Sequence, residues 1–233
     1  MNREEYLDSL LKTYAPMGKL SERNGNRVLL LKHRSLDRRL IIHSSEIPNP
    51  VYERLLSIKS PFLPEIYDVI ELDDGQVVLQ EFIDGISVSE SLKVELFSYR
   101  EASRILKSVL KALHTLHGLK IIHRDVKPEN IILGASGRVV LIDLDAARFL
   151  TGAPRDTVIM GTVGFVSPEQ LGLHESDERT DIYAAGVLLN VLLTGKLPTE
   201  TVASGKAGRI VRKCTMINPL DRYQSAEEML AQL

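Results

Sequence analysis

The feature that constrains this chain most is a change in hydrophobic periodicity near Gly85. Before it, short apolar runs alternate with charged or turn-forming stretches. After it, apolar residues recur at helical spacing. A strand-rich part followed by a helix-rich part favours a segregated α+β architecture over alternating βαβ units. We therefore expect an α+β fold of two lobes, with a small lobe over residues 1–83 and a mainly helical lobe over residues 84–233.

The small lobe is expected to hold one antiparallel sheet and two short helices. Tyr6, Leu7, Leu10, Leu11 and Tyr14 recur at helical spacing and predict an opening amphipathic helix. A second helix is expected to stop before a proline. The predicted strands cover residues 28–31, 40–42, 65–72 and 76–82, and the second helix covers residues 51–59.

The helical lobe is expected to begin with a long helix. Its apolar residues follow the i, i+3/i+4 pattern from Ala102 to Leu116, and Gly118 gives a stop signal. Two short strands are predicted around Ser136 and Gly137. Those strands cover residues 131–133 and 139–142, and two later helices cover residues 181–193 and 225–233.

Composition excludes several classes of protein. The net charge of −2 gives no electrostatic case for nucleic acid or for an acidic membrane surface. The longest apolar run, residues 184–193, is interrupted by Asn190 and is too short to span a bilayer. The charged start of the chain does not read as a signal peptide, and the single Cys214 fits a reducing compartment. The expected location is the cytoplasm.

The segment with the clearest chemistry follows the long helix and reads His123-Arg124-Asp125-Val126-Lys127-Pro128-Glu129-Asn130. Asp143 follows Asn130 by thirteen residues, within Ile142-Asp143-Leu144-Asp145. These two stretches strongly resemble the catalytic loop and the metal-binding segment of protein kinases. The resemblance covers about residues 14–233 and is more specific in the helical lobe than in the small lobe.

Phosphoryl transfer explains why these residue types occur together. The transferred group is anionic, so the protein mainly positions it and neutralises its charge. The resemblance implies that Asp125 orients the attacking hydroxyl and that Lys127 screens charge. Magnesium prefers hard oxygen ligands, which Asn130 and Asp143 would supply. The implied cofactors are ATP and Mg²⁺ or Mn²⁺.

Three later stretches extend the resemblance. Residues 161–169 resemble the end of a kinase activation segment, and residues 181–187 resemble the buried helix whose Asp181 anchors the catalytic loop. Pro219-Leu220-Asp221-Arg222 resembles the site of a buried arginine. The resemblance implies an ion pair between Glu169 and Arg222, because either charge alone would be costly in the interior.

The activation segment also carries candidates for specificity and regulation. Thr162 stands where Ser/Thr-directed kinases carry a threonine, although a turn residue explains it equally well. Arg124 resembles an arginine that meets a phosphate on this segment. Thr151 and Thr157 are the candidate phosphorylation sites that could pair with it. Alternatively, Arg124 bonds only backbone carbonyls.

The small lobe departs from the family pattern at its glycine-rich loop. When Val28 is placed on the valine that covers the adenine, residues 21, 23 and 26 occupy the three glycine positions. Only Gly25 remains, out of register. Backbone close to phosphates needs glycine, so Arg23 and Arg27 are candidates to contact phosphate through their side chains instead.

A second departure concerns the phosphate-binding lysine. Counting from Val28 places His43 in its slot, and a mostly neutral imidazole does not replace an ammonium. Lys32 is a further candidate for compensation. The best candidate for the glutamate that partners the lysine is Glu53, ahead of Glu46, with a surface residue as the alternative.

The remaining positions follow from the same placement. The hinge is expected near Glu81–Ile83, with Gln80 at the back of the adenine pocket, so that Mg·ATP would bind between the lobes. The family's Asp-Phe-Gly reads Asp143-Leu144-Asp145. Because a bacterial subset of kinase-like proteins has an aspartate at this third position, Asp145 does not argue against activity.

Two functions follow from this pattern. The first is an atypical Ser/Thr protein kinase of bacterial style that acts on a protein substrate and binds nucleotide weakly. The alternative is a pseudokinase, a regulatory or scaffolding module for a protein partner, which His43 and the missing glycines favour. A small-molecule kinase on the same fold fits less well, because the full activation segment and Lys127-Pro128 are typical of protein kinases.

Overall fold

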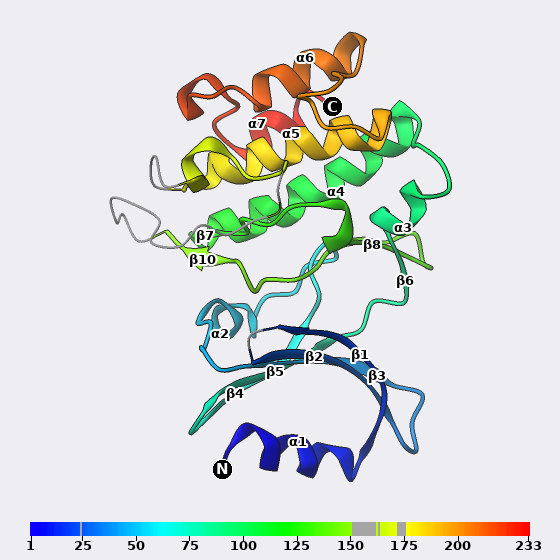
Figure 1. Ribbon diagram of the computed structural model, residues 1–233, viewed down its shortest axis with the longest axis vertical. Coiled ribbons are helices and arrows are strands. Elements are labelled where there is room, and N and C mark those ends of the chain that lie inside the picture. The colour runs from blue at the N-terminus through cyan, green and yellow to red at the C-terminus, as the bar shows by residue number, and fades with distance from the viewer. Residues whose placement is uncertain (24, 151–161, 163, 172–175) are drawn as a thin grey trace. The chain divides into compact units, whose positions relative to one another are not determined.

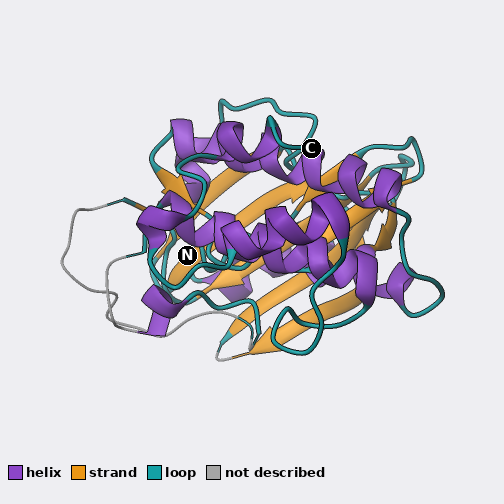
Figure 2. Ribbon diagram, turned by 90° about the horizontal axis from the view of Figure 1, so that it is seen from above, coloured by secondary structure: helices purple, strands orange, loops and turns teal. Residues whose placement is uncertain are grey.

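The chain forms two compact units in the computed structural model, which describes residues 1–23, 25–150, 162, 164–171 and 176–233. The first unit comprises residues 1–60 and 64–83, and the second comprises residues 61–63 and 84–233. The types of secondary structure expected before and after Gly85 are confirmed. The first unit is a sheet with helices, and the second is mainly helical (Figures 1 and 2).

Alternating apolar residues build a five-stranded antiparallel sheet in the first unit. Its strands lie in the order β1-β2-β3-β5-β4, and the four expected strands are all present. The strands are β1 (Tyr14–Arg23), β2 (Asn26–His33), β3 (Arg39–Ser45), β4 (Ile66–Leu72) and β5 (Gly75–Glu81).

One face of the sheet is covered by α1 (Arg3–Leu11), as Figure 1 shows. A capping box between Asn2 and Glu5 fixes the start of this helix. Leu7 of α1 packs into one buried cluster with Leu31, Leu40, Ile42 and Val77 from the strands. Since side chains of a strand alternate in direction, Ile41 and His43 of β3 point to the opposite face.

Three details of the first unit differ from expectation. The opening helix ends at Leu11, and Tyr14 instead begins β1, where it pairs with His33 of β2. The second helix, α2 (Val51–Leu55), is shorter than expected and ends in tight turns in which Leu56 and Ile58 donate to carbonyls three residues back. Residues 20–23 and 26–28 are strand, and β1 and β2 stay paired up to Arg23 and Asn26.

Long helices organise the second unit. The α4 helix (Tyr99–Gly118) starts with a capping box between Ser98 and Glu101. It lies beside α5 (Glu178–Thr194), which ends at Gly195 in a left-handed conformation (φ 69°). Both long helices were expected. The unit also holds α3 (Val88–Leu92), α6 (Gly205–Cys214) and the expected C-terminal helix, here α7 (Ala226–Leu230).

Short strands frame the loops that follow α4. The expected pair is present as β8 (Ile131–Gly134) and β9 (Val139–Leu141), and β6 (Gly85–Ser87) joins them in a three-stranded sheet. A two-residue ladder pairs β7 (Ile121–Ile122) with β10 (Arg148–Phe149). The sequence interpretation missed β6, β7, β10 and α3, because their apolar patterns are too short for periodicity to identify. It also missed α6, although the buried residues Ala207, Ile210, Val211 and Cys214 recur at helical spacing.

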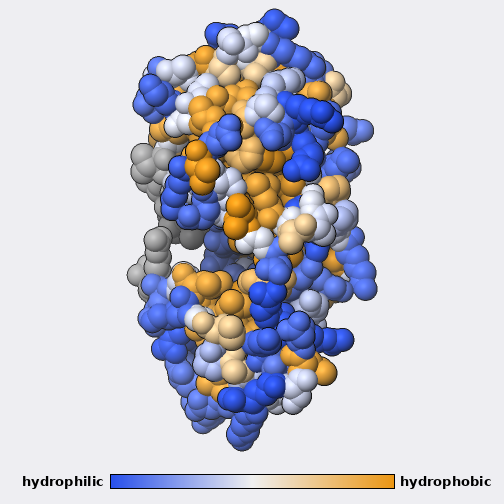
Figure 3. Space-filling view, turned by 90° about the vertical axis from the view of Figure 1, so that its right-hand side faces the viewer, coloured by the Kyte–Doolittle hydropathy of each residue, from blue (hydrophilic) through white to orange (hydrophobic). Residues whose placement is uncertain are grey.

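The surface of the second unit mixes apolar and hydrophilic side chains. Figure 3 shows both kinds beside one another on the face that carries α3 and the start of α4. In the described part of the chain, no helix combines the length with the hydropathy that crossing a membrane requires.

Candidate active site

The loop between β7 and β8 is held by a single buried carboxylate. Asp181 of α5 accepts hydrogen bonds from the backbone N–H groups of His123 (2.9 Å) and Arg124 (2.8 Å). His117 of α4 places its Nε2 2.8 Å from the same carboxylate. Arg124 adopts a left-handed conformation (φ 68°), which these bonds stabilise. The arrangement agrees with the anchoring role expected for Asp181.

Asp181 is fully buried and ionised. Burial raises the pKa of its carboxyl, but the hydrogen bond and charge of His117 and the N–H of His123 lower it, and the net pKa lies below the ordinary value. A carboxylate that accepts several hydrogen bonds is a strong acceptor. The buried Asp181 carboxylate therefore fixes the backbone of the loop at His123 and Arg124.

Asp125 lies at the centre of a hydrogen-bonded cluster on this loop. Its Oδ2 lies 2.6 Å from Nζ of Lys127 and accepts from the Asn130 amide at 3.0 Å, while its Oδ1 accepts from the Thr162 hydroxyl at 3.0 Å. Lys127 also donates to Thr162 Oγ1 at 2.8 Å. The side chains of Asp125 and Lys127 are 14% and 18% exposed, so both remain partly accessible from solvent.

Asn130 and Asp143 come together through the backbone. The Ile142 N–H donates to the Asn130 carbonyl at 2.8 Å, and Asp143 follows directly in a left-handed conformation (φ 66°). The Asp145 N–H donates to Oδ1 of Asp143 at 3.2 Å. A short 3-10 turn, η1 (Pro128–Asn130), buries Asn130, whose amide nitrogen donates to Asp125.

This donor set fits a hard cation. The amide nitrogen of Asn130 is committed to Asp125, and its oxygen and the Asp143 carboxylate are the hard ligands that magnesium prefers. Among the described residues no group of three or more His, Cys, Asp or Glu side chains could hold a metal. A Mg²⁺ site needs only a few protein ligands when phosphate and water oxygens complete the coordination.

The described residues after Thr162 contact the loop between β7 and β8. Gln170, in the short turn η2 (Pro168–Leu171), donates from Nε2 to the Arg124 carbonyl at 3.0 Å and accepts from the Ser167 N–H at 3.1 Å. The proposed phosphorylation sites Thr151 and Thr157 lie outside the described residues.

The expected pair between Glu169 and Arg222 is present and bidentate, with N–O distances of 2.6 and 2.9 Å. Arg222 is completely buried, and Thr180 donates a further hydrogen bond to Glu169. Burial raises the pKa of Glu169, but the hydrogen bonds and charge of Arg222 lower it overall. Arg222 follows the turn η3 (Pro219–Asp221) and also donates to the carbonyls of Met216 and Ile217.

In the first unit, the strands bring the expected nucleotide residues into register. His43 of β3 lies opposite Val28 of β2 on one side and Val78 of β5 on the other. Gln80 is buried opposite Ile41, and Glu81 lies opposite Leu40. Glu81 also accepts from the Glu65 N–H, and Ile83 is the last residue of this unit.

The environment of His43 differs from that of a phosphate-binding lysine. His43 is 7% exposed, and its ring lies 5.8 Å from the ring of the buried Tyr52 on α2. Glu53, the next residue, is solvent-exposed. The side chain that packs on the His43 slot is therefore Tyr52, which the sequence interpretation did not single out.

Two of the candidate compensating cations are engaged in ion pairs on the surface. Arg27 lies 2.6 Å from Glu4 and 3.0 Å from Glu22, and Lys32 lies 3.1 Å from Asp37. These pairs do not support the suggestion that either residue replaces the missing lysine.

Two residues of the site were not singled out from the sequence. His117 lies on the buried stripe of α4, where an apolar residue is the ordinary expectation, and Gln170 lies in a short turn. The sequence did contain a signal for His117: it is a polar residue on the otherwise apolar stripe of the predicted helix. Because buried polar groups require partners, such a residue indicates a buried hydrogen bond.

Comparison with known proteins agrees with this geometry. Residues 30–231 match the family described as protein kinase domain. The chain is 32% identical over 216 residues to Serine/threonine-protein kinase D of Synechocystis, covering 80% of this chain and 42% of the relative. It is 29% identical over 203 residues to Serine/threonine-protein kinase PrkC of Bacillus subtilis, covering 76% of this chain and 31% of that protein.

A third relative is Probable serine/threonine-protein kinase PknB of Lactococcus lactis, 33% identical over 149 residues, with 63% of this chain and 24% of the relative covered. The chain thus spans less than half the length of each of these three proteins.

Proposed function

Since this chain belongs to the protein kinase family, we propose that it transfers the terminal phosphoryl group of ATP to a serine or threonine hydroxyl of a protein. The observation that carries the proposal is the cluster around Asp125, in which Lys127, Asn130 and Thr162 all bond one partly exposed carboxylate. A carboxylate held on three sides is a positioned base, which is what this transfer requires.

Each residue of the cluster has a distinct task. Asp125 would accept the hydrogen bond of the incoming hydroxyl and take its proton. Lys127, 2.6 Å from Asp125, would place its charge beside the transferred group. Thr162 bonds both side chains and so fixes their separation. Asp181 positions the loop but does not touch the reacting atoms.

Asn130 and Asp143 would hold Mg²⁺ or Mn²⁺ through oxygen. When bound, the cation supplies charge neutralisation for the phosphate oxygens. The left-handed backbone at Asp143 and its bond from the Asp145 N–H orient the carboxylate before any cation arrives.

We assign nucleotide contacts in the first unit to Val28, Gln80, Glu81 and Ile83, with His43 in the slot of the usual lysine. Because a buried imidazole beside Tyr52 offers no fixed ammonium, nucleotide binding should be weaker than in relatives that have the lysine. Glu53 is exposed, so any role as a charge partner would require α2 to be rearranged. We place the activity in the cytoplasm, in keeping with the lone buried Cys214.

A second candidate function, the pseudokinase, is favoured by one observation: the packing of His43 against Tyr52. In that case the chain would regulate or scaffold a protein partner. The ordered cluster around Asp125 favours the enzyme, because a scaffold has no electrostatic need to aim a lysine and a carboxylate at a common point.

Phosphotransfer from radiolabelled ATP to generic protein acceptors, with Mg²⁺ and with Mn²⁺, tests the proposal. Asp125→Ala and Asp143→Ala should each abolish the signal, whereas Asp37→Ala, which removes a surface carboxylate paired with Lys32, should leave it unchanged. Signal in both active-site variants would point to a contaminating kinase. No signal in the wild type, together with no nucleotide-dependent thermal shift, would favour the pseudokinase.

A further inference from the structure

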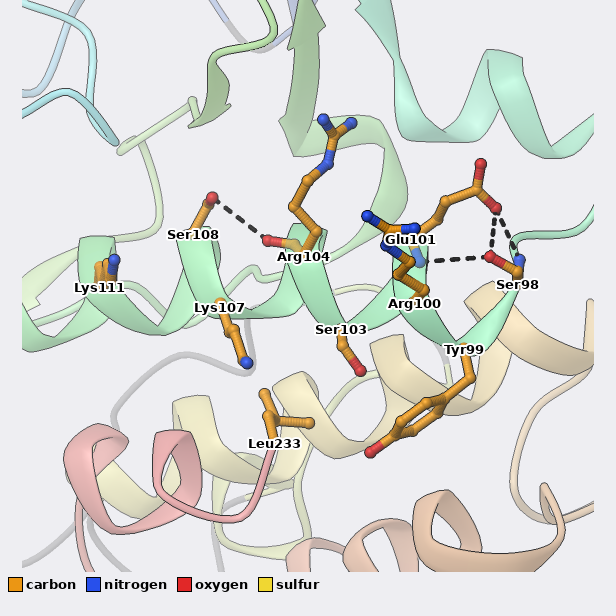
Figure 4. Close-up of a pocket in the computed structure, with 10 residues that line it drawn as sticks. All are labelled: Ser98, Tyr99, Arg100, Glu101, Ser103, Arg104, Lys107, Ser108, Lys111 and Leu233. Atoms are coloured by element: carbon orange, nitrogen blue, oxygen red, sulfur yellow. Dashed lines mark hydrogen bonds between the residues drawn. The ribbon is translucent and has the colours of Figure 1, made fainter.

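A groove along α4 carries charge that phosphoryl transfer does not use. It has a volume of about 1020 Å³ and is lined by one face of α4 together with Leu233. Four of its lining residues are cations, namely Arg100, Arg104, Lys107 and Lys111 (Figure 4). In a chain whose net charge is −2, this is a local reversal of sign.

The spacing of the cations follows the helix. They are separated by four, three and four residues, so they fall on one narrow stripe of a helix with about 3.6 residues per turn. All four side chains are exposed, while the opposite stripe of α4, from Ala102 to Leu116, is buried in the core. Like charges at this spacing repel one another, so the stripe costs the helix some stability.

Little in the described part of the chain offsets the charge of the stripe, and the one nearby acidic side chain, Glu101, acts on Arg104 alone. None of the four cations forms an ion pair with a described residue. The only acidic side chain among the residues that line the groove, Glu101, accepts hydrogen bonds from the N–H and the hydroxyl of Ser98 at 2.9 and 2.6 Å. Lys111 has one neighbour of a different kind, the Phe62 ring at 5.2 Å.

A buried polar atom marks the floor of the groove. Ser103 is 7% exposed, and its hydroxyl has no hydrogen-bond partner among the described residues. Figure 4 shows Ser103 and Lys107 directed to the side on which Leu233 lies, whereas Arg104 is directed to the other side. Lys107 and the unsatisfied hydroxyl of Ser103 therefore lie on the same side of α4.

We propose that this groove docks an acidic, extended segment of a protein partner, with carboxylates at alternating positions. The stripe from Arg100 to Lys111 is about 16 Å long at about 1.5 Å per residue. An extended chain advances about 3.3 Å per residue, so about five residues span the stripe. Side chains two residues apart lie on one face of that segment, about 6.6 Å apart, close to the axial spacing of about 4.5–6 Å between successive cations.

Nucleic acid is the less suitable occupant. Four cations on a chain of net charge −2 give a short electrostatic footprint, and Tyr99 is the single aromatic side chain that lines the groove. Carboxylates, by contrast, form charge-assisted hydrogen bonds with both arginine and lysine. The inference concerns binding, and it stands whether the chain is a kinase or a pseudokinase.

Fluorescence anisotropy with a labelled seven-residue peptide that carries glutamate at three alternating positions tests this docking site. The whole chain should bind it, and raising NaCl from about 50 to about 300 mM should weaken binding, since exposed charges are screened. Arg104→Glu with Lys107→Glu should weaken binding by about tenfold or more. The matched pair Lys12→Glu and Arg38→Glu, exposed cations of the first unit, changes net charge equally and should alter binding by less than about twofold.

Three results would overturn the proposal: equal binding of the glutamine counterpart of the peptide, equal loss in both charge-reversal pairs, or equally strong competition by single-stranded oligothymidylate. Circular dichroism checks that the variant with Arg104→Glu and Lys107→Glu is folded. If it is misfolded, the neutral variant with Arg104→Gln and Lys107→Gln takes its place. Unchanged peptide binding by that folded variant would also overturn the docking site.

Discussion

The Nε2 atom of His117 lies 2.8 Å from Oδ2 of Asp181, and both side chains are buried. The same carboxylate accepts the N–H groups of His123 and Arg124, so three donors from two separate segments converge on it. Because buried donors need partners, this one aspartate joins α4, α5 and the catalytic loop. The geometry of Asp125 therefore depends on a residue that lies outside its own hydrogen-bonded cluster.

Asp181→Ala should be among the most destabilising substitutions in the second unit. It leaves three buried donors unsatisfied, and we expect the free energy of unfolding to fall by about 3–5 kcal/mol. His117→Leu removes one donor and keeps the carboxylate bonded, and should cost about 1–2 kcal/mol. Denaturant unfolding measures both, with Asp177→Ala, the N-cap of α5, as a control expected to cost about 1 kcal/mol. Equal losses in all three variants would contradict the convergence on Asp181.

The buried pair of Glu169 and Arg222 should make stability depend on acidic pH. The pKa of Glu169 is lowered in the folded chain, whereas it is about 4.3 when unfolded. A lowered folded pKa contributes stability above the unfolded pKa, and that stability is lost as pH falls through the folded pKa. Urea midpoints should therefore decrease as pH drops below about 4.3. Asp181, whose pKa is also lowered, contributes in the same direction.

Glu169→Gln isolates the contribution of this pair. The variant should be less stable at neutral pH, and its loss of stability on acidification should be shallower than that of the wild type, because one titrating carboxyl is gone. A pH dependence identical to the wild type would mean that Glu169 is not the group responsible. Arg222→Met at neutral pH should cost about 3–5 kcal/mol, since it leaves a buried carboxylate unpaired.

Lys120→Gly should stabilise the chain. Lys120 lies two residues after the end of α4, just beyond its C-cap Leu119, in a left-handed conformation (φ 61°), where glycine is usual. Its N–H donates to the His117 carbonyl. Glycine removes the steric cost of a side chain there and adds some unfolded-state entropy, so we expect a net gain of about 0.5–1 kcal/mol. Lys120→Ala keeps the Cβ and loses only the weak Glu178 contact, so it should show no gain in thermal unfolding.

The sequence predicted the two long helices and the loop that carries Asp125 in the helical unit, because the signals there are chemical as well as periodic. The spacing of Asp125, Lys127, Asn130 and Asp143 predicts a site whose first three members the structure joins by direct hydrogen bonds. The Glu169–Arg222 pair follows from the cost of burying either charge alone. These inferences rest on the spacing of polar residues along the sequence, and that spacing does not depend on which apolar residues lie between them.

The first unit was harder to predict. The β1–β2 hairpin depends on pairing between residues 14–23 and 26–33, and β1 lacks the clean alternation that would have identified it. The packing of Tyr52 on His43 depends on how α2 meets the sheet, which no local pattern encodes. Arg27 and Lys32 were plausible phosphate ligands by position, but nearby carboxylates engage them.

His43→Lys should strengthen nucleotide binding if the proposed function is right. His43 occupies the strand position between Val28 and Val78, and a lysine there can keep its stem along apolar neighbours while its ammonium reaches polar surroundings. A charge-assisted contact with phosphate is worth about 1.4 kcal/mol more than a neutral one, so the Kd for Mg·ATP should fall about tenfold. Isothermal titration calorimetry measures it. Ser45→Lys adds the same charge two residues along the same face of β3 and should leave the Kd within about twofold, because its ammonium is displaced by about 6.6 Å. An unchanged Kd in a folded His43→Lys variant would show that this slot does not meet phosphate, and the pseudokinase would then be the better description.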